Sequence, residues 1–159
     1  MRNRVYKNFK KTYPDWDYSL KNKIFIDEKG AVHKEKWKWI KGYKYLYQIS
    51  SFGRLKSFFY YKKGKIKTPS IINEGYLSYK LTKNKLEKSI TAHRLVATHF
   101  IKNAQKKPQI NHKDFNIANN SVWNLEWVTQ SENQKHSFLE GDKNHIGVRN
   151  PRCILTEKD

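Results

Sequence analysis

The part of this chain that most restricts its fold is a polar loop enclosed by two short apolar segments and followed by a helix signal. Residues 109–112 and 125–128 have the composition of short strands, and the asparagine-rich segment between them suits turns and left-handed backbone. Thr129 and Glu132 follow with the spacing of a capping box, Thr at the N-cap and Glu at the third helical position. The sequence therefore predicts a unit of strand, loop, strand and helix, with the helix extending to about Leu139.

A set of chemically able side chains lies on this predicted unit. Compact folding would bring Asn111 and His112, on the first strand, beside Asn133 in the first helical turn. Histidine can take a proton from water near neutral pH, and amide oxygens can bind a hard cation. Asn124 completes the set as a group that could hold the histidine in the right orientation. Taken singly, each residue is more commonly structural, but the ordered set offers the base, the cation ligands and the orienting group that phosphodiester hydrolysis requires.

The charge of the chain indicates a polyanionic partner. There are 33 Lys and Arg against 14 Asp and Glu, for a formal net charge of +19. Between Lys36 and Lys88 the only acids are Glu74 and Glu87, whereas a merely solvated surface would mix both signs. We therefore expect a surface that contacts phosphates. A membrane-surface protein would need a strongly amphipathic basic helix, and an RNA-binding protein a recognisable RNA motif; neither is visible.

Upstream of the loop unit, the alternation of side chains predicts antiparallel hairpins. Residues 54–61 are predicted to form one strand, and 75–81 and 86–90 a hairpin that turns at 83–85. A shorter hairpin is predicted over 23–32, with Gly30 in its turn. Thr91 is placed to cap a helix over 93–101. Aromatic residues, 14% of the chain, can supply the core.

The remaining features suggest a cytoplasmic protein with access to DNA. The single cysteine, Cys153, excludes an internal disulfide. The N-terminus is basic without the apolar region of a signal peptide, and no apolar run is long enough to span a bilayer. We expect no membrane partner and no small-molecule cofactor.

At the loop unit, the chain resembles the HNH endonuclease family, in particular its homing-endonuclease branch with the ββα-metal fold. The matching positions are Asn111, His112, Lys113, Asp114, Asn116, Asn119, Asn120, Asn124, Leu125, Trp127, Val128, Thr129 and Asn133. Residues 93–101 resemble the helix that precedes this motif in the family. Residues 37–57 resemble the nuclease-associated modular domain often found before it. Together the resemblance covers residues 36–139.

The resemblance implies an α+β fold in which an N-terminal antiparallel β-sheet module precedes a ββα-metal (HNH) nuclease unit. It divides the chain into an extension (1–35), a DNA-binding sheet module (36–92), the nuclease unit (93–140) and a tail (141–159). The tail resembles the start of a helix-turn-helix that stops at its first helix.

The resemblance also implies roles for individual residues. His112 would be the general base, helped by Asn124, and Asn111 and Asn133 would hold one Mg²⁺ per chain, for which Mn²⁺ could substitute. The partner would be double-stranded DNA, nicked by a monomer with 5′-phosphate and 3′-hydroxyl products. The resemblance and the charge pattern together suggest two further groups of residues. Those expected to bind DNA are Arg54, Lys56, Lys62, Lys63, Lys65, Lys67, Lys113 and His136, and those expected to be structural are His93 and Trp127.

Two departures from the family pattern keep a second interpretation open. Position 111 is Asn where many relatives have Asp, which leaves the expected ligands without a carboxylate. Position 115 is Phe where the pattern has Gly, and a positive φ there would strain the backbone. The alternative is a catalytically inactive relative that acts as a DNA-binding regulatory or structural protein.

Overall fold

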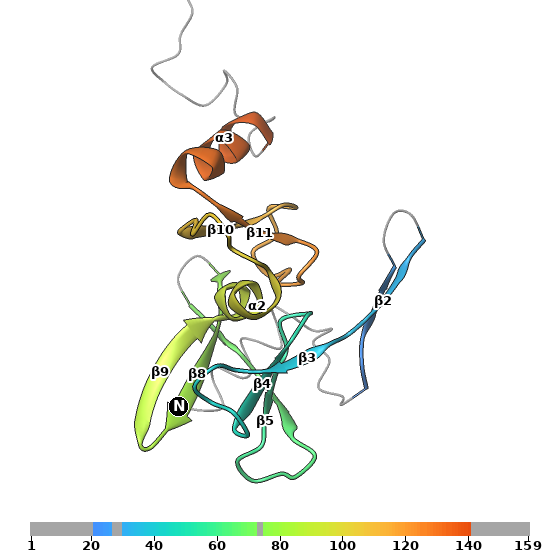
Figure 1. Ribbon diagram of the computed structural model, residues 1–159, viewed down its shortest axis with the longest axis vertical. Coiled ribbons are helices and arrows are strands. Elements are labelled where there is room, and N and C mark those ends of the chain that lie inside the picture. The colour runs from blue at the N-terminus through green and yellow to red at the C-terminus, as the bar shows by residue number, and fades with distance from the viewer. Residues whose placement is uncertain (1–20, 27–29, 73–74, 141–159) are drawn as a thin grey trace, which may run out of the picture.

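The computed structural model describes residues 21–26, 30–72 and 75–140 (Figure 1). Most of the predicted N-terminal extension, Cys153 and the tail at 141–159 lie outside the described residues. The helices are α2 (Ala92–Phe100) and α3 (Gln130–Glu140). The strands are β1 (Ile24–Ile26), β2 (Val32–Lys34), β3 (Trp37–Trp39), β4 (Tyr47–Ser50), β5 (Leu55–Ser57), β6 (Lys65–Lys67), β7 (Ser70–Ile71), β8 (Leu77–Lys83), β9 (Leu86–Thr91), β10 (Gln109–His112) and β11 (Leu125–Val128).

These strands form antiparallel sheets, and the fold is mixed, as expected from the sequence. Strands β3 to β6 make a four-stranded sheet in sequence order, and β7 to β9 make a three-stranded one. Two ribbons, β1–β2 and β10–β11, stand apart from these sheets. Helix α2 lies between the sheets and the β10–β11 ribbon, and α3 lies beyond that ribbon (Figure 1).

One hydrophobic core joins the sheets to the loop unit. Ile49 of β4, Leu81 of β8, Val96 of α2 and Leu125 of β11 are among its buried members. Because the same core includes side chains from both halves, burial of apolar area in the sheets also fixes the base of the β10–β11 ribbon. None of the described helices is long and apolar enough to cross a membrane.

The hairpins match the prediction at β8–β9 and depart from it at β5. Asn84 and Lys85 both have positive φ, at 50° and 64°, as the tight turn of a two-residue hairpin requires. The strand predicted over 54–61 ends at Ser57, because the register pairs Ser57 with Lys65 and leaves the loop between them without a partner strand. Phe59, Tyr60 and Tyr61 lie in that loop and are exposed.

Both helices begin where the sequence indicates. Thr91 is the N-cap residue of α2, although its hydroxyl makes no capping bond and lies 3.2 Å from Nε2 of His93. At α3 the capping box forms as predicted. The Thr129 amide donates to the Glu132 carboxylate at 2.7 Å, and the Glu132 amide donates to the Thr129 hydroxyl at 3.2 Å.

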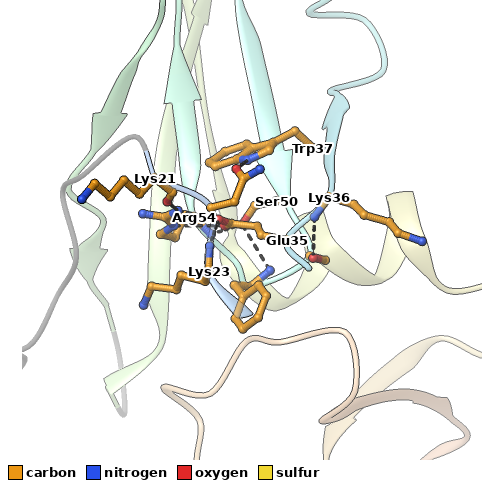
Figure 2. Close-up of polar contacts among 10 residues, drawn as sticks. Lys21, Lys23, Glu35, Lys36, Trp37, Ser50 and Arg54 are labelled. Carbon is orange, nitrogen blue, oxygen red and sulfur yellow. Dashed lines mark hydrogen bonds and ion pairs between the residues drawn. The ribbon is translucent and has the colours of Figure 1, made fainter. Parts of the chain in front are cut away.

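Arg54 corrects one prediction made from charge. Its side chain is 1% exposed, and its guanidinium is ion-paired with Glu35, whose side chain is also buried (Figure 2). The same guanidinium donates to the Lys21 carbonyl at 2.8 Å, and Glu35 accepts from the Lys23 amide at 2.9 Å. Arg54 thus fastens residues 21–23 to the sheet. A side chain buried this completely cannot reach a DNA groove in this fold, so Arg54 stabilises the fold and does not contact DNA.

Candidate active site

The β10–β11 ribbon presents the candidate residues at its buried end. In its register Asn111 lies opposite Glu126 and His112 lies opposite Leu125. Asn111 and His112 are both buried, with 7% and 6% of their surface exposed. The polar loop that joins the two strands folds back beside them, so both side chains are held by their surroundings.

His112 is oriented by Asn120, which the sequence did not single out for this role. The Nε2 atom of His112 lies 3.4 Å from Oδ1 of Asn120. The other end of the same amide donates to the Ala118 carbonyl at 3.0 Å, which fixes the oxygen toward the imidazole. Asn120 is itself buried, at 3% exposure. From the sequence, Asn120 could be recognised only as one of several asparagines in the loop.

Burial also sets the charge of His112. Desolvation lowers its pKa below the ordinary histidine value, and the hydrogen bond with Asn120 and the nearby Asp114 carboxylate oppose this shift only in part. The imidazole is therefore held neutral at neutral pH, the state in which it can accept a proton.

Asn124 braces the loop through hydrogen bonds with Asp114 and Asn119, and none of these bonds is to His112. Its Oδ1 accepts from the Asp114 amide at 3.0 Å, and its Nδ2 donates to the Asp114 carboxylate at 2.7 Å and to the Asn119 carbonyl at 2.9 Å. These bonds tie both ends of the loop together. Any effect of Asn124 on His112 therefore passes through the loop.

Phe115 stands at a backbone position that favours glycine, as anticipated for a positive-φ turn. Its φ is 58°, in the left-handed region, where a bulky side chain is strained. Its ring stacks on His136 of α3, with 4.3 Å between centroids and an interplanar angle of 15°. The turn is thus preserved with phenylalanine in it, and His136 is engaged by that ring.

His93 lies against His112 although the sequence assigned it only a structural role. The ring centroids are 5.3 Å apart, and Tyr76 packs on His93 at 5.2 Å. The Nδ1 atom of His93 is buried without a hydrogen-bond partner, and burial is the first cause of its pKa falling to about 4. A second neutral imidazole therefore adjoins the candidate base.

Asn111 and Asn133 each offer an amide oxygen, the kind of donor that a hard cation prefers. Within the described part of the chain, no group of three or more His, Cys, Asp or Glu side chains comes together to hold a metal. Asn111 donates through Nδ2 to Glu126 at 3.0 Å, which leaves its Oδ1 available. Asn133 lies in the first turn of α3, which packs against β10. Oxygen ligands of this kind fit Mg²⁺ or Mn²⁺ and would not favour a soft metal.

The nominated lysines occupy two kinds of surroundings. Lys62, Lys63, Lys65 and Lys67 are exposed on the β5–β6 hairpin. Beside them a groove of about 910 Å³ is lined by Lys65, Lys67 and the loop aromatics, among other residues. Lys56 is instead half-buried, its ammonium 3.9 Å from the Trp37 ring centroid, and burial is the first cause of its lowered pKa.

Two more nominated residues have contacts within the protein. Lys113 donates its ammonium to the Trp123 carbonyl at 2.9 Å, at the outer side of the loop. Trp127 donates its indole N–H to the Ile101 carbonyl at 3.2 Å and so joins β11 to the end of α2.

Comparison with known proteins identifies relatives of this chain. A NUMOD4 motif matches residues 35–82. The DNA endonuclease I-HmuI of Bacillus phage SP01 is 39% identical over 108 residues, 68% of this chain and 60% of that protein. The uncharacterized HNH endonuclease L245 of Acanthamoeba polyphaga mimivirus is 39% identical over 97 residues, 61% of this chain and 28% of that protein.

A solved structure, described as DNA binding and cleavage by the HNH homing endonuclease I-HmuI, matches with a TM-score of 0.60 at 39% identity. It is matched over 67% of this chain and 59% of the solved one. The chain thus spans less than two thirds of the length of these relatives. These matches confirm that the chain is related to the HNH homing endonucleases, as its motif indicated.

Proposed function

We propose that this relative of the HNH homing endonucleases is a Mg²⁺-dependent DNA endonuclease. It would nick one strand of double-stranded DNA and leave a 5′-phosphate and a 3′-hydroxyl. The observation that carries the proposal is the buried, neutral His112, oriented by Asn120 and adjacent in the chain to the amide of Asn111. A positioned, uncharged imidazole beside cation ligands is what hydrolysis of a phosphodiester needs.

The hydrogen bond to Asn120 supports Nδ1 of His112 as the nitrogen that acts as the base. Because the Asn120 oxygen can only accept, the tautomer that fits this bond has its hydrogen on Nε2 and its free lone pair on Nδ1. Nδ1 takes a proton from a water molecule, the water oxygen attacks phosphorus, and the bond from phosphorus to the 3′ oxygen breaks. The 3′ oxygen then takes a proton from solvent.

Asn111 and Asn133 would hold the one ion per chain, with Mn²⁺ as a substitute for Mg²⁺. The ion supplies positive charge to the phosphate and to the leaving oxygen. One such centre per chain supports a monomer that cuts one strand at a time. The exposed lysines of the β5–β6 hairpin would hold the DNA backbone, since phosphate contacts provide affinity without reading sequence.

The test is cleavage of supercoiled plasmid with Mg²⁺ by the wild-type protein and by His112→Ala. We expect the wild type to produce the relaxed nicked form, and the variant to be slower by about 10²- to 10⁴-fold, the usual cost of losing a general base. DNA affinity should stay near wild type. His33→Ala, which removes a histidine from the β1–β2 ribbon, is the control and should cut normally.

Two results would contradict the proposal. If His112→Ala nicks at the wild-type rate, His112 is not the base. If the wild type binds the plasmid but leaves it supercoiled at every Mg²⁺ concentration, the DNA-binding but inactive alternative replaces the nuclease.

A further inference from the structure

We infer that Glu126 is a positioning residue for the ion-binding site, and that it supplies the negative charge which Asn111 lacks. The inference rests on the proposed function, because it concerns the same ion. Three observations support it: the register of the β10–β11 ribbon, the hydrogen bond between the two side chains, and the engagement of the other nearby carboxylates.

The register places the two side chains on the same face of the ribbon. Asn111 and Glu126 are direct cross-strand partners, and directly opposed residues of an antiparallel pair project to one side. Their side chains meet there, with Nδ2 of Asn111 donating to Oε1 of Glu126 at 3.0 Å. Asn111 is buried and Glu126 is partly exposed, so this bond is partly shielded from water, and a charged acceptor makes it stronger than a bond between neutral groups.

The carboxylate determines which way the Asn111 amide faces. An ionised carboxylate only accepts hydrogen bonds, so the amide must turn its NH₂ group toward Glu126. The amide oxygen is then directed away from Glu126 and is free to act as a ligand. Without Glu126 the amide could flip and offer its NH₂ group to the ion, which would repel it.

The other two acids near the site, Asp114 and Glu132, already accept hydrogen bonds from other groups. Asp114 accepts from the side chains of Asn119 and Asn124 and from the Asn116 amide, all within the loop. Glu132 accepts from Lys107 and closes the capping box of α3. Of these three acids, Glu126 is therefore the one whose carboxylate is hydrogen-bonded directly to a proposed ion ligand, Asn111.

The experiment is a calorimetric titration of Mn²⁺ into the protein with a short DNA duplex, all in the His112→Ala background so that the duplex stays intact. Glu126→Gln keeps an acceptor oxygen of the same size for the Asn111 amide but removes the charge. We expect Mn²⁺ to bind about 10- to 100-fold more weakly, the range found for residues that support metal ligands.

Glu87→Gln is the matched control. It makes the same charge change at an exposed glutamate of β9 that forms an ion pair with Lys80, on the β8–β9 hairpin and outside the β10–β11 ribbon. Mn²⁺ affinity should be unchanged in this variant. The comparison separates a local effect of Glu126 from a general effect of net charge.

A swap of the two groups tests whether charge or mere packing is at work. In Asn111→Asp/Glu126→Gln the charge moves to the other strand, and the glutamine NH₂ can donate to the aspartate, so the pair is kept with its roles reversed. We expect Mn²⁺ affinity at or above that of the parent. Asn111→Asp alone opposes two carboxylates, so its melting temperature should fall without metal and recover with Mn²⁺.

The possible outcomes distinguish the role of Glu126 from the proposed function. Equal Mn²⁺ affinity in Glu126→Gln and Glu87→Gln overturns the role of Glu126, and so does a swap variant that stays as weak as Glu126→Gln. If the parent protein binds no Mn²⁺ even with duplex present, the proposed metal dependence fails, and the role of Glu126 at that ion fails with it.

Discussion

The β5–β6 hairpin and the β10–β11 ribbon are both short antiparallel pairs of strands, yet they differ in whether their polar side chains are exposed or buried. The first carries exposed charge, in Lys62, Lys63, Lys65 and Lys67. The second buries neutral groups, in Asn111, His112, Asn120 and Asn124. Long exposed lysines attract phosphate from many positions, whereas buried amides work in one orientation only. Changes in the first region should therefore have graded, salt-dependent effects, and changes in the second should act through orientation.

The largest expected effect concerns DNA affinity. Neutralising Lys62, Lys63, Lys65 and Lys67 together should make the slope of log K against log salt shallower by up to about 3.6, at about 0.9 for each phosphate that a lysine no longer neutralises. Binding isotherms at four salt concentrations measure it. The control removes four lysines of the β8–β9 hairpin, at positions 80, 83, 85 and 88. An equal change in both variants would mean that net charge, and not the β5–β6 surface, sets the affinity.

The next prediction concerns Arg54, the charged residue that is buried beside the four-stranded sheet. Arg54→Met leaves Glu35 buried without its partner and should lower the free energy of unfolding by about 3–5 kcal/mol in urea titrations. Arg54→Met/Glu35→Met removes both charges and should recover most of that loss. If the single variant is as stable as the wild type, the pair is not the anchor of residues 21–23.

A third prediction uses pH to test the buried imidazole of His93, which packs against His112 of the β10–β11 ribbon. Since the pKa of His93 is about 4 in the folded protein against 6.5 ordinarily, its neutral form stabilises the fold above pH 6.5. That contribution is lost as pH falls from 6.5 through 4, by up to ~3 kcal/mol. His93→Gln should flatten this acid-side fall in unfolding free energy. A variant with the same pH profile as the wild type would place the acid sensitivity elsewhere.

The smallest expected effect is at Phe115. Glycine adopts a φ of 58° without strain, so Phe115→Gly should raise the free energy of unfolding by about 1 kcal/mol, less what the stack on His136 contributes. Phe115→Asn, which tolerates the same backbone, is the companion variant. Thermal or urea unfolding of both variants measures the difference. Reduced stability in both would show that the ring contact outweighs the strain.

Local patterns were enough to predict much of this molecule. The β8–β9 hairpin follows from side-chain alternation and a turn at Asn84–Lys85, and α3 follows from the Thr129–Glu132 capping box. The loop unit, with His112 on its first strand, could be predicted in the same way. These features depend on residues within a few positions of one another, so their energetics are encoded in short stretches of sequence.

The tertiary structure decided which polar side chains are buried and which partners they meet. Arg54 carried the same charge signal as the exposed lysines, and only its pairing with Glu35, nineteen residues away, places it inside. His93 reaches His112 because α2 packs beside β10. The pairing of Asn111 with Glu126 needs the strand register as well as the strands. Burial and orientation arise from contacts between distant segments, and such contacts satisfy most buried polar groups.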